Sequence, residues 1–111
     1  MKLYLYWKDV EGNSYNIGIL SKENNEYEFI LNKEEYNNAL INGCSGIGNL
    51  GTENQKSEKL FQFFKERIPG KDSPRLNKVL EIYKMKNYDE MELLKRSGAI
   101  VNTDRFFLQE N

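Results

Sequence analysis

The hydrophobic residues of this chain change their spacing at Asn32, and that change constrains the fold more than any other feature of the sequence. Before Asn32 they alternate with other residues, which is the two-residue period of a strand. In the second half of the chain they fall three and four residues apart, which is the period of an amphipathic helix. A chain of 111 residues has room for one hydrophobic core. We therefore expect one domain, residues 1–111, that combines a sheet with helices.

Three strand-like segments open the chain, at residues 3–7, 15–21 and 27–31. Turn-forming residues separate them, so they predict an antiparallel meander. Residues 105–108 are strand-like again, and a lone C-terminal strand needs a neighbour. We place that strand beside the meander. The expected fold class is α+β, with a small antiparallel sheet of about four strands and roughly three to four helices packed on one face.

Two pairs of residues have the spacing of a capping box, in which side chains satisfy free N–H groups at a helix start. Asn32 with Glu35 predicts a short helix over residues 33–40. Asp89 with Glu92 predicts another, which ends at Gly98 because glycine suits the left-handed position after a helix. Glu34-Glu35 and Glu90-Glu92 are acidic pairs, and we interpret them as first-turn residues that favour the helix dipole.

The middle of the chain predicts a loop and two further helices. Residues 43–56 are rich in Gly, Ser, Asn and Thr, which is typical of a loop. We expect a helix from Ser57 to residue 68 and another from Pro74, because Pro69-Gly70 interrupts the helical pattern. In the second of these helices, Leu76, Val79, Leu80 and Tyr83 share one face, which predicts that this face packs on the core.

The composition narrows the functional classes. The chain has no histidine, which excludes a Ser-His-Asp triad, a Cys-His pair and a histidine metal site. Its one cysteine, Cys44, allows no internal disulfide, which favours a reducing compartment and a cytoplasmic protein. A net charge of -1 gives no overall positive field for nucleic acid or an anionic membrane. We therefore expect no catalytic residue, metal or cofactor, no direct contact with nucleic acid and no membrane.

Two features of the loop resemble reactive motifs. Residues 46–51 match G-x-G-x-x-G, the spacing of a phosphate-binding loop. A polar helix precedes them where that motif requires a buried strand, so we favour a flexible or partner-binding loop. Cys44 has no basic neighbour in sequence that would stabilise a thiolate, which favours a passive thiol.

The aromatic content suggests a binding surface. Seven Tyr, six Phe and one Trp are more than a core of this size easily holds, and aromatic residues and arginine prevail at interface centres. Phe63 lies off the apolar stripe of its predicted helix. The loop at 43–56 carries two isolated apolar residues, which either hold the loop down or serve as exposed anchors. Residues 65–75 are locally basic, as in a solvated connection or a protein contact. The partner-binding candidates are Phe63, Arg67, Lys71, Arg75, Ile47 and Leu50.

The chain also resembles, nearly end to end, the N-terminal subdomain of HipA-family serine/threonine kinases, and in particular its free-standing form, the HipS-type antitoxin. I-G-I-L-S at 17–21 is similar to the family's V-G-x-L segment, and Y-x-F follows at 27–29. L-F-Q-F-F-K-E-R-I-P at 60–69 resembles its F-x-F-F-x-x-L-L-P stretch, and D-E-M-E-L-L-K-R-S-G at 89–98 resembles its P-F-x-L-L-x-x-x-G stretch. The family's ATP-binding and catalytic residues lie in later parts of the full kinase, so the resemblance implies a non-catalytic module.

These features allow several functional hypotheses. The first is a protein-binding antitoxin that docks on a HipA-like kinase and holds it inactive, as the resemblance implies. The second is a small phage or mobile-element inhibitor of a bacterial defence nuclease, which its size and apolar loop residues suit equally well. The third is a small enzyme that uses tyrosine, lysine or paired carboxylates, which would require a concave site with perturbed pKa values. A nucleic-acid-binding module is disfavoured by the charge balance.

Overall fold

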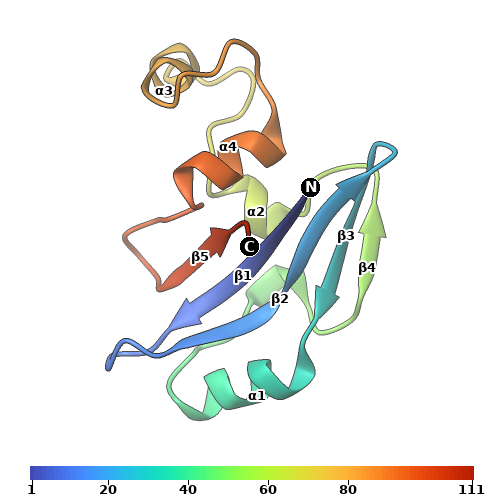
Figure 1. Ribbon diagram of the computed structural model, residues 1–111, viewed down its shortest axis with the longest axis vertical. Helices are drawn as coiled ribbons and strands as arrows, with labels where there is room; N and C mark the ends of the chain where they lie inside the picture. The colour runs from blue at the N-terminus through green and yellow to red at the C-terminus, as the bar shows by residue number, and fades with distance from the viewer.

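Five antiparallel strands form the sheet around which the structure is built (Figure 1). The computed structural model describes residues 1–111. The strands run in the order β4-β3-β2-β1-β5, so the C-terminal strand pairs with the N-terminal one, and the α+β prediction is confirmed. Their bounds are β1 (Lys2–Lys8), β2 (Ser14–Glu23), β3 (Glu26–Leu31), β4 (Gln55–Ser57) and β5 (Phe106–Gln109).

The edge strand β4 differs from the sequence prediction, which places most of it in a loop and Ser57 at the start of a helix. Its three residues pair with β3, from Tyr27 opposite Ser57 to Phe29 opposite Gln55. The side chain of Asn54 extends this edge, because its Oδ1 accepts a hydrogen bond from the Leu31 N–H at 3.0 Å. Three residues are too few to show a period, so only pairing with β3 defines this strand.

Four α-helices and one 3-10 helix accompany the sheet. The side chains of Asn32 and Asp89 accept hydrogen bonds from the N–H groups of Glu35 and Glu92, both at 3.1 Å, so both predicted helix starts are confirmed. None of the helices is long and apolar enough to cross a membrane. Their bounds are α1 (Lys33–Ile41), η1 (Gly48–Leu50, the 3-10 helix), α2 (Gln62–Lys65), α3 (Leu76–Ile82) and α4 (Glu90–Ser97).

Two helices are shorter than predicted. The helix α2 is a single turn that begins after Phe61, because the residues before it are held in β4 and its connection. The helix α3 begins at Leu76, and the predicted first residue, Pro74, lies in the preceding turn. There the Ser73 hydroxyl accepts a hydrogen bond from the Arg75 N–H at 3.2 Å.

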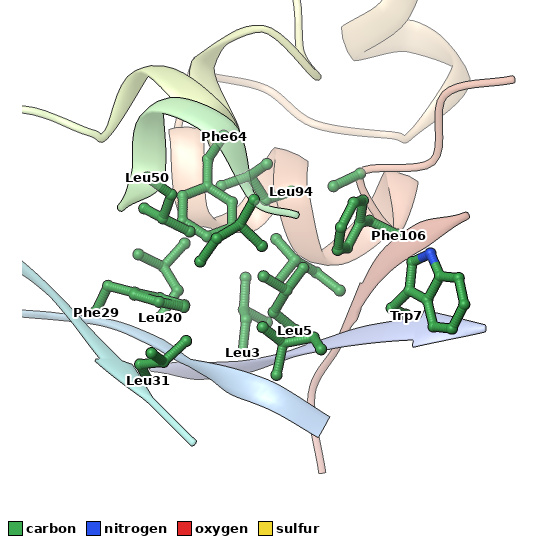
Figure 2. Packing of buried hydrophobic residues seen from close by; sticks show 14 of the residues in the cluster. Leu3, Leu5, Trp7, Leu20, Phe29, Leu31, Leu50, Phe64, Leu94 and Phe106 are labelled. Carbon is green, nitrogen blue, oxygen red and sulfur yellow. The ribbon is translucent and has the colours of Figure 1, made fainter. Parts of the chain in front are cut away.

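The hydrophobic core lies between one face of the sheet and the helical layer. Figure 2 shows Leu20 and Phe29 of the sheet facing Leu50 and Phe64. The Phe29 and Phe64 rings are 5.9 Å apart at their centroids, and both residues are fully buried. Burial of each such side chain contributes about 1.5–3 kcal/mol. The sheet therefore fixes where α2 and η1 sit.

The glycine inside β2 has a packing role. A Cβ atom at Gly18 would lie 2.6 Å from the Phe29 ring and 2.5 Å from the Ile30 carbonyl oxygen. A glycine inside a strand predicts a bulge or a close approach by another element. Both are present, because the register between β1 and β2 shifts beside Gly18 and the neighbouring strand approaches it with side chain and backbone. Gly18 therefore leaves the space that the Phe29 ring occupies beside β2.

Candidate partner-binding surface

The two apolar loop residues proposed as exposed anchors, Ile47 and Leu50, are core residues. Each is 1% exposed, so their prediction as exposed anchors is wrong. The 3-10 helix η1 folds the glycine-rich segment over the core and turns both side chains inward, and the Ile47 N–H donates a hydrogen bond to the Tyr36 hydroxyl at 3.4 Å. The alternative interpretation of these residues, as apolar pins that hold the loop, agrees with their burial.

Phe63 and Arg67 form a clamp at one side of the core. The Phe63 ring packs edge-on against Phe64 and Phe106, with centroids 5.2 Å and 5.4 Å away. The Arg67 guanidinium lies 4.7 Å from the centroid of the Phe63 ring. The Arg67 side chain is only 5% exposed, so it is not the open basic contact that the sequence suggested.

The same arginine fastens the chain that follows α4. Its Nη1 donates a hydrogen bond to the Ala99 carbonyl oxygen at 2.8 Å, and its Nη2 is paired with the Asp104 carboxylate. Ala99 itself is buried and has a left-handed φ of 55°, which is costly for a residue with a side chain. Arg67 therefore holds the segment 99–104 against α2.

A groove opens beside this clamp. Its volume is about 740 Å³, and Arg75 lies at its polar rim. Its apolar lining consists of Ile68, Val79, Ile100 and Val101. We call it the α3 groove. Ile100 is 68% exposed, so the groove presents apolar surface to solvent. Arg75 and the nearby Lys71 are both exposed, as the sequence predicted for this basic segment.

The helix α3 contributes one of the four apolar residues of the groove, Val79, and has no buried residue. The prediction that Leu76, Val79, Leu80 and Tyr83 pack on the core is therefore wrong, because these side chains are only half-buried. Figure 1 shows the reason: α3 lies at the far end of the molecule, beyond α4 and away from the sheet. The apolar face of this helix is thus partly covered, and Val79 is its one residue that lines the groove.

The C-terminal end of α3 and the segments that flank the helix are nevertheless held in place. Nη1 of Arg96, on α4, donates hydrogen bonds to the carbonyl oxygens of Tyr83 at 2.6 Å and Lys84 at 3.3 Å. A guanidinium at the C-terminal end of a helix also opposes the negative end of the helix dipole. The Tyr88 hydroxyl donates to the Pro69 carbonyl oxygen at 3.0 Å, which joins the segment that follows α3 to the one that precedes it. These contacts therefore hold the walls of the α3 groove in place.

Shifted pKa values keep cysteine and tyrosine side chains of this structure protonated, and they keep one carboxylate ionised and hydrogen-bonded. Burial raises the pKa of the Cys44 thiol, which disfavours the reactive thiolate. Burial, and then donation of its hydroxyl to the Glu90 carboxylate at 2.8 Å, raise the pKa of Tyr27 well above its ordinary value. No three cysteine, aspartate or glutamate side chains gather into a group that could hold a metal ion.

Asp9 is the buried charged residue that the sequence did not single out. Burial raises the pKa of its carboxyl group, but hydrogen bonds outweigh that effect and hold the pKa below its ordinary value. One oxygen accepts from the N–H groups of Glu11 and Asn13, and the other accepts from the Asn13 amide and the Tyr15 hydroxyl. These contacts come from the β1–β2 turn and from Tyr15 at the start of β2. Hydrogen bonds therefore occupy both oxygens of the carboxylate, and the carboxylate holds the turn in its conformation.

None of the four apolar residues of the groove was among the predicted partner-binding residues. Ile68 and Val79 were assigned to helices, and Ile100 and Val101 were missed. Their signal was two consecutive β-branched residues outside any helical or strand period. Comparisons with protein-family models, curated proteins and solved structures found no match for this chain. A function is therefore inferred from the geometry of the α3 groove together with the resemblance described above.

Proposed function

We propose that this chain is a non-catalytic protein-binding module, an antitoxin-like inhibitor that docks on a HipA-like serine/threonine kinase through the α3 groove. The observation that carries the binding role is the apolar lining of the groove, which includes Val79 of α3, a helix with no buried residue, and Ile100, which is 68% exposed. The choice of a kinase as the partner rests on the family resemblance of residues 17–21, 60–69 and 89–98.

The chemistry of the groove suits a protein partner. An apolar floor with a charged rim is the usual composition of a protein interface, with a hydrophobic centre and a polar edge. Arg75 supplies positive charge and Glu66 negative charge at the edge, so a partner rim that carries both charges would be complementary, and the exposed Lys71 borders a separate hollow. Because the net charge is only -1, long-range attraction contributes little, and apolar contact supplies most of the affinity.

The test is co-expression of this chain with a HipA-like kinase encoded next to it. We expect the two proteins to co-purify and the growth defect caused by the kinase to disappear. Ile100→Asp, which places a charge in the groove, should abolish both effects. Ile41→Asp is the matched control, because Ile41 is an isoleucine 81% exposed on α1 and is not part of the groove.

The possible outcomes test the identity of the partner and the contact surface independently. A kinase that stays toxic and never co-purifies with the unmutated chain refutes the antitoxin assignment. A complex that forms equally well with Ile100→Asp refutes the α3 groove as the contact. Loss of the complex with both variants would indicate a general folding defect, and circular dichroism of each variant distinguishes that case.

One observation favours the second hypothesis, an inhibitor of a defence nuclease. Glu23, Glu26 and Glu58 border a polar hollow of about 680 Å³ beside the β2–β3 turn. An acidic surface of this kind suits the basic nucleic-acid-binding groove of a nuclease. Inhibition of a purified nuclease that is lost on Glu23→Lys, with binding to the kinase absent, would favour this function over the first.

A further inference from the structure

The segment between α2 and α4 differs from the rest of the chain in its burial. From Pro69 to Glu90 no residue is buried, whereas Phe64 before this segment and Met91 after it are core residues. None of the apolar residues of α3 packs against the core. We call residues 70–87, which contain α3, the α3 flap. The α3 flap therefore contributes no side chain to the core.

The hydrogen bonds of the α3 flap are almost all internal. Its backbone N–H groups donate to carbonyl oxygens of the flap itself, from Ser73 to Gly70 at 3.1 Å and from Met85 to Leu80 at 2.8 Å. One side chain reaches the flap from outside, because Nη1 of Arg96 donates to the carbonyl oxygens of residues 83 and 84. No ion pair joins the flap to the rest of the protein. Opening of the flap therefore breaks these two hydrogen bonds and none in the sheet.

The two ends of the α3 flap lie beside each other. The hydroxyl of Tyr88 and the carbonyl oxygen of Pro69, which flank the flap in sequence, are joined by a hydrogen bond of 3.0 Å. Figure 1 shows α3 at the far end of the loop that this contact closes. A loop whose ends are fixed side by side can unfold without moving the elements that it connects. The base of the flap therefore separates its motion from the sheet.

The helix α3 has little support of its own. It has seven residues and no side-chain cap at its first turn. Isolated helices shorter than about 12–15 residues are marginal in water. The guanidinium of Arg96 lies at the C-terminal end of α3, and Glu92 orients it by accepting a hydrogen bond from its Nε at 2.8 Å. Arg96 is therefore the one residue outside the flap that stabilises α3 through hydrogen bonds.

We propose that the α3 flap opens and closes as a unit while the sheet and the core stay folded, and that Arg96 holds it closed. In the open state the helix α3 is lost and Arg96 loses its two carbonyl acceptors. Segments with few buried apolar contacts and exposed backbone hydrogen bonds are those that unfold separately at low free-energy cost. The α3 flap has both properties.

Opening of the flap would change the α3 groove. Ser73, Arg75 and Val79 belong to the flap and line the groove, so the open state lacks one of the walls of the groove. A molecule that binds only the closed state holds the flap closed, because binding shifts the equilibrium toward the form that is bound. The inference concerns the chain alone and does not rest on the proposed function.

The test is hydrogen exchange of the purified full chain, followed by NMR. The N–H groups of Val79 and Tyr83, which donate within α3, should exchange at least about a hundredfold faster than those of the β1–β2 ladder. Arg96→Met should accelerate their exchange by a further factor of about ten, because it removes the charged donor from two carbonyl oxygens. Exchange in the β1–β2 ladder should not change.

Two further variants test the direction and the specificity of this effect. Lys84→Gly should slow exchange in α3 by about two- to fivefold, because Lys84 has a left-handed φ of 56° that glycine adopts without strain. Arg105→Met is the matched control. The guanidinium of Arg105 also donates to two carbonyl oxygens, those of Lys8 at 2.7 Å and Asp9 at 2.9 Å, and it lies outside the flap. Its replacement should leave exchange in α3 unchanged.

Limited digestion with trypsin tests whether the sheet survives opening. The open flap exposes the bond after Lys78, which lies within α3 when the flap is closed. Cleavage there should yield residues 1–78 and 79–111, which should elute together in gel filtration because β5 of the second fragment pairs with β1 of the first. Arg96→Met should accelerate this cleavage by about tenfold, since slow cleavage follows the population of the open state.

Three results would overturn the proposal. Amides of α3 that exchange as slowly as those of the β1–β2 ladder would mean that the flap opens only when the whole protein unfolds. An unchanged exchange rate in Arg96→Met, or an equal acceleration in Arg105→Met, would show that Arg96 does not hold the flap closed. Fragments that separate after cleavage would show that the sheet does not survive opening.

Discussion

Replacing Arg67 with methionine should destabilise the protein by about 3 kcal/mol, because one guanidinium joins three parts of the structure. It donates to the buried carbonyl of Ala99, and a hydrogen bond to a charged group contributes about 1.5–3 kcal/mol. Its position over the Phe63 ring adds about 1 kcal/mol. The pair with Asp104 adds little, since that carboxylate is 32% exposed. Methionine preserves the length and apolar stem of the side chain, so the loss reports these polar contacts.

The assay is urea unfolding followed by circular dichroism, with Arg75→Met as the control. Arg75 is exposed, so its replacement should change the free energy of unfolding by less than about 0.5 kcal/mol. Arg67→Lys should fall between the two, because lysine keeps the charge but lacks the planar fork of donors. A loss below about 1 kcal/mol for Arg67→Met would refute the reasoning, since it would mean that the segment 99–104 holds its place without the clamp.

Three further predictions concern single residues. Hydrogen bonds hold the pKa of Asp9 below its ordinary value. The contribution of Asp9 to stability is therefore complete above about pH 4 and is lost as the pH falls through the lowered pKa. The melting temperature of Asp9→Asn should consequently fall less steeply with acidification than that of the unmutated chain. Lys84 has a φ of 56° at the end of α3, so Lys84→Gly should raise the free energy of unfolding by about 0.5–1 kcal/mol, and a decrease in urea midpoint would contradict this. Cys44 should react with iodoacetamide at least about tenfold more slowly in the native protein than in urea, because burial raises the pKa of its thiol; equal rates would show that the thiol is accessible.

The sequence predicted the candidate surface only in part. Lys71 and Arg75 were identified as exposed positive charges from their place in a basic connection between helices. Arg67 was assigned to the same exposed set, although its side chain turns inward to Phe63 and Ala99. The difference between these arginines lies in their neighbours, which come from distant parts of the chain. No local pattern distinguishes a clamped arginine from a solvated one.

What the sequence determined by itself is the set of features that depend on contacts a few residues apart. The alternation of β1 to β3, the helix caps at Asn32 and Asp89 and the left-handed Gly98 all follow from such short-range rules, and all are present. The tertiary structure alone decided which apolar residues are buried. It turned Ile47 and Leu50 into core, left α3 outside the core and made a strand of residues 55–57. Burial depends on which elements meet in space, and a periodic pattern says only that a face is apolar, not what covers it.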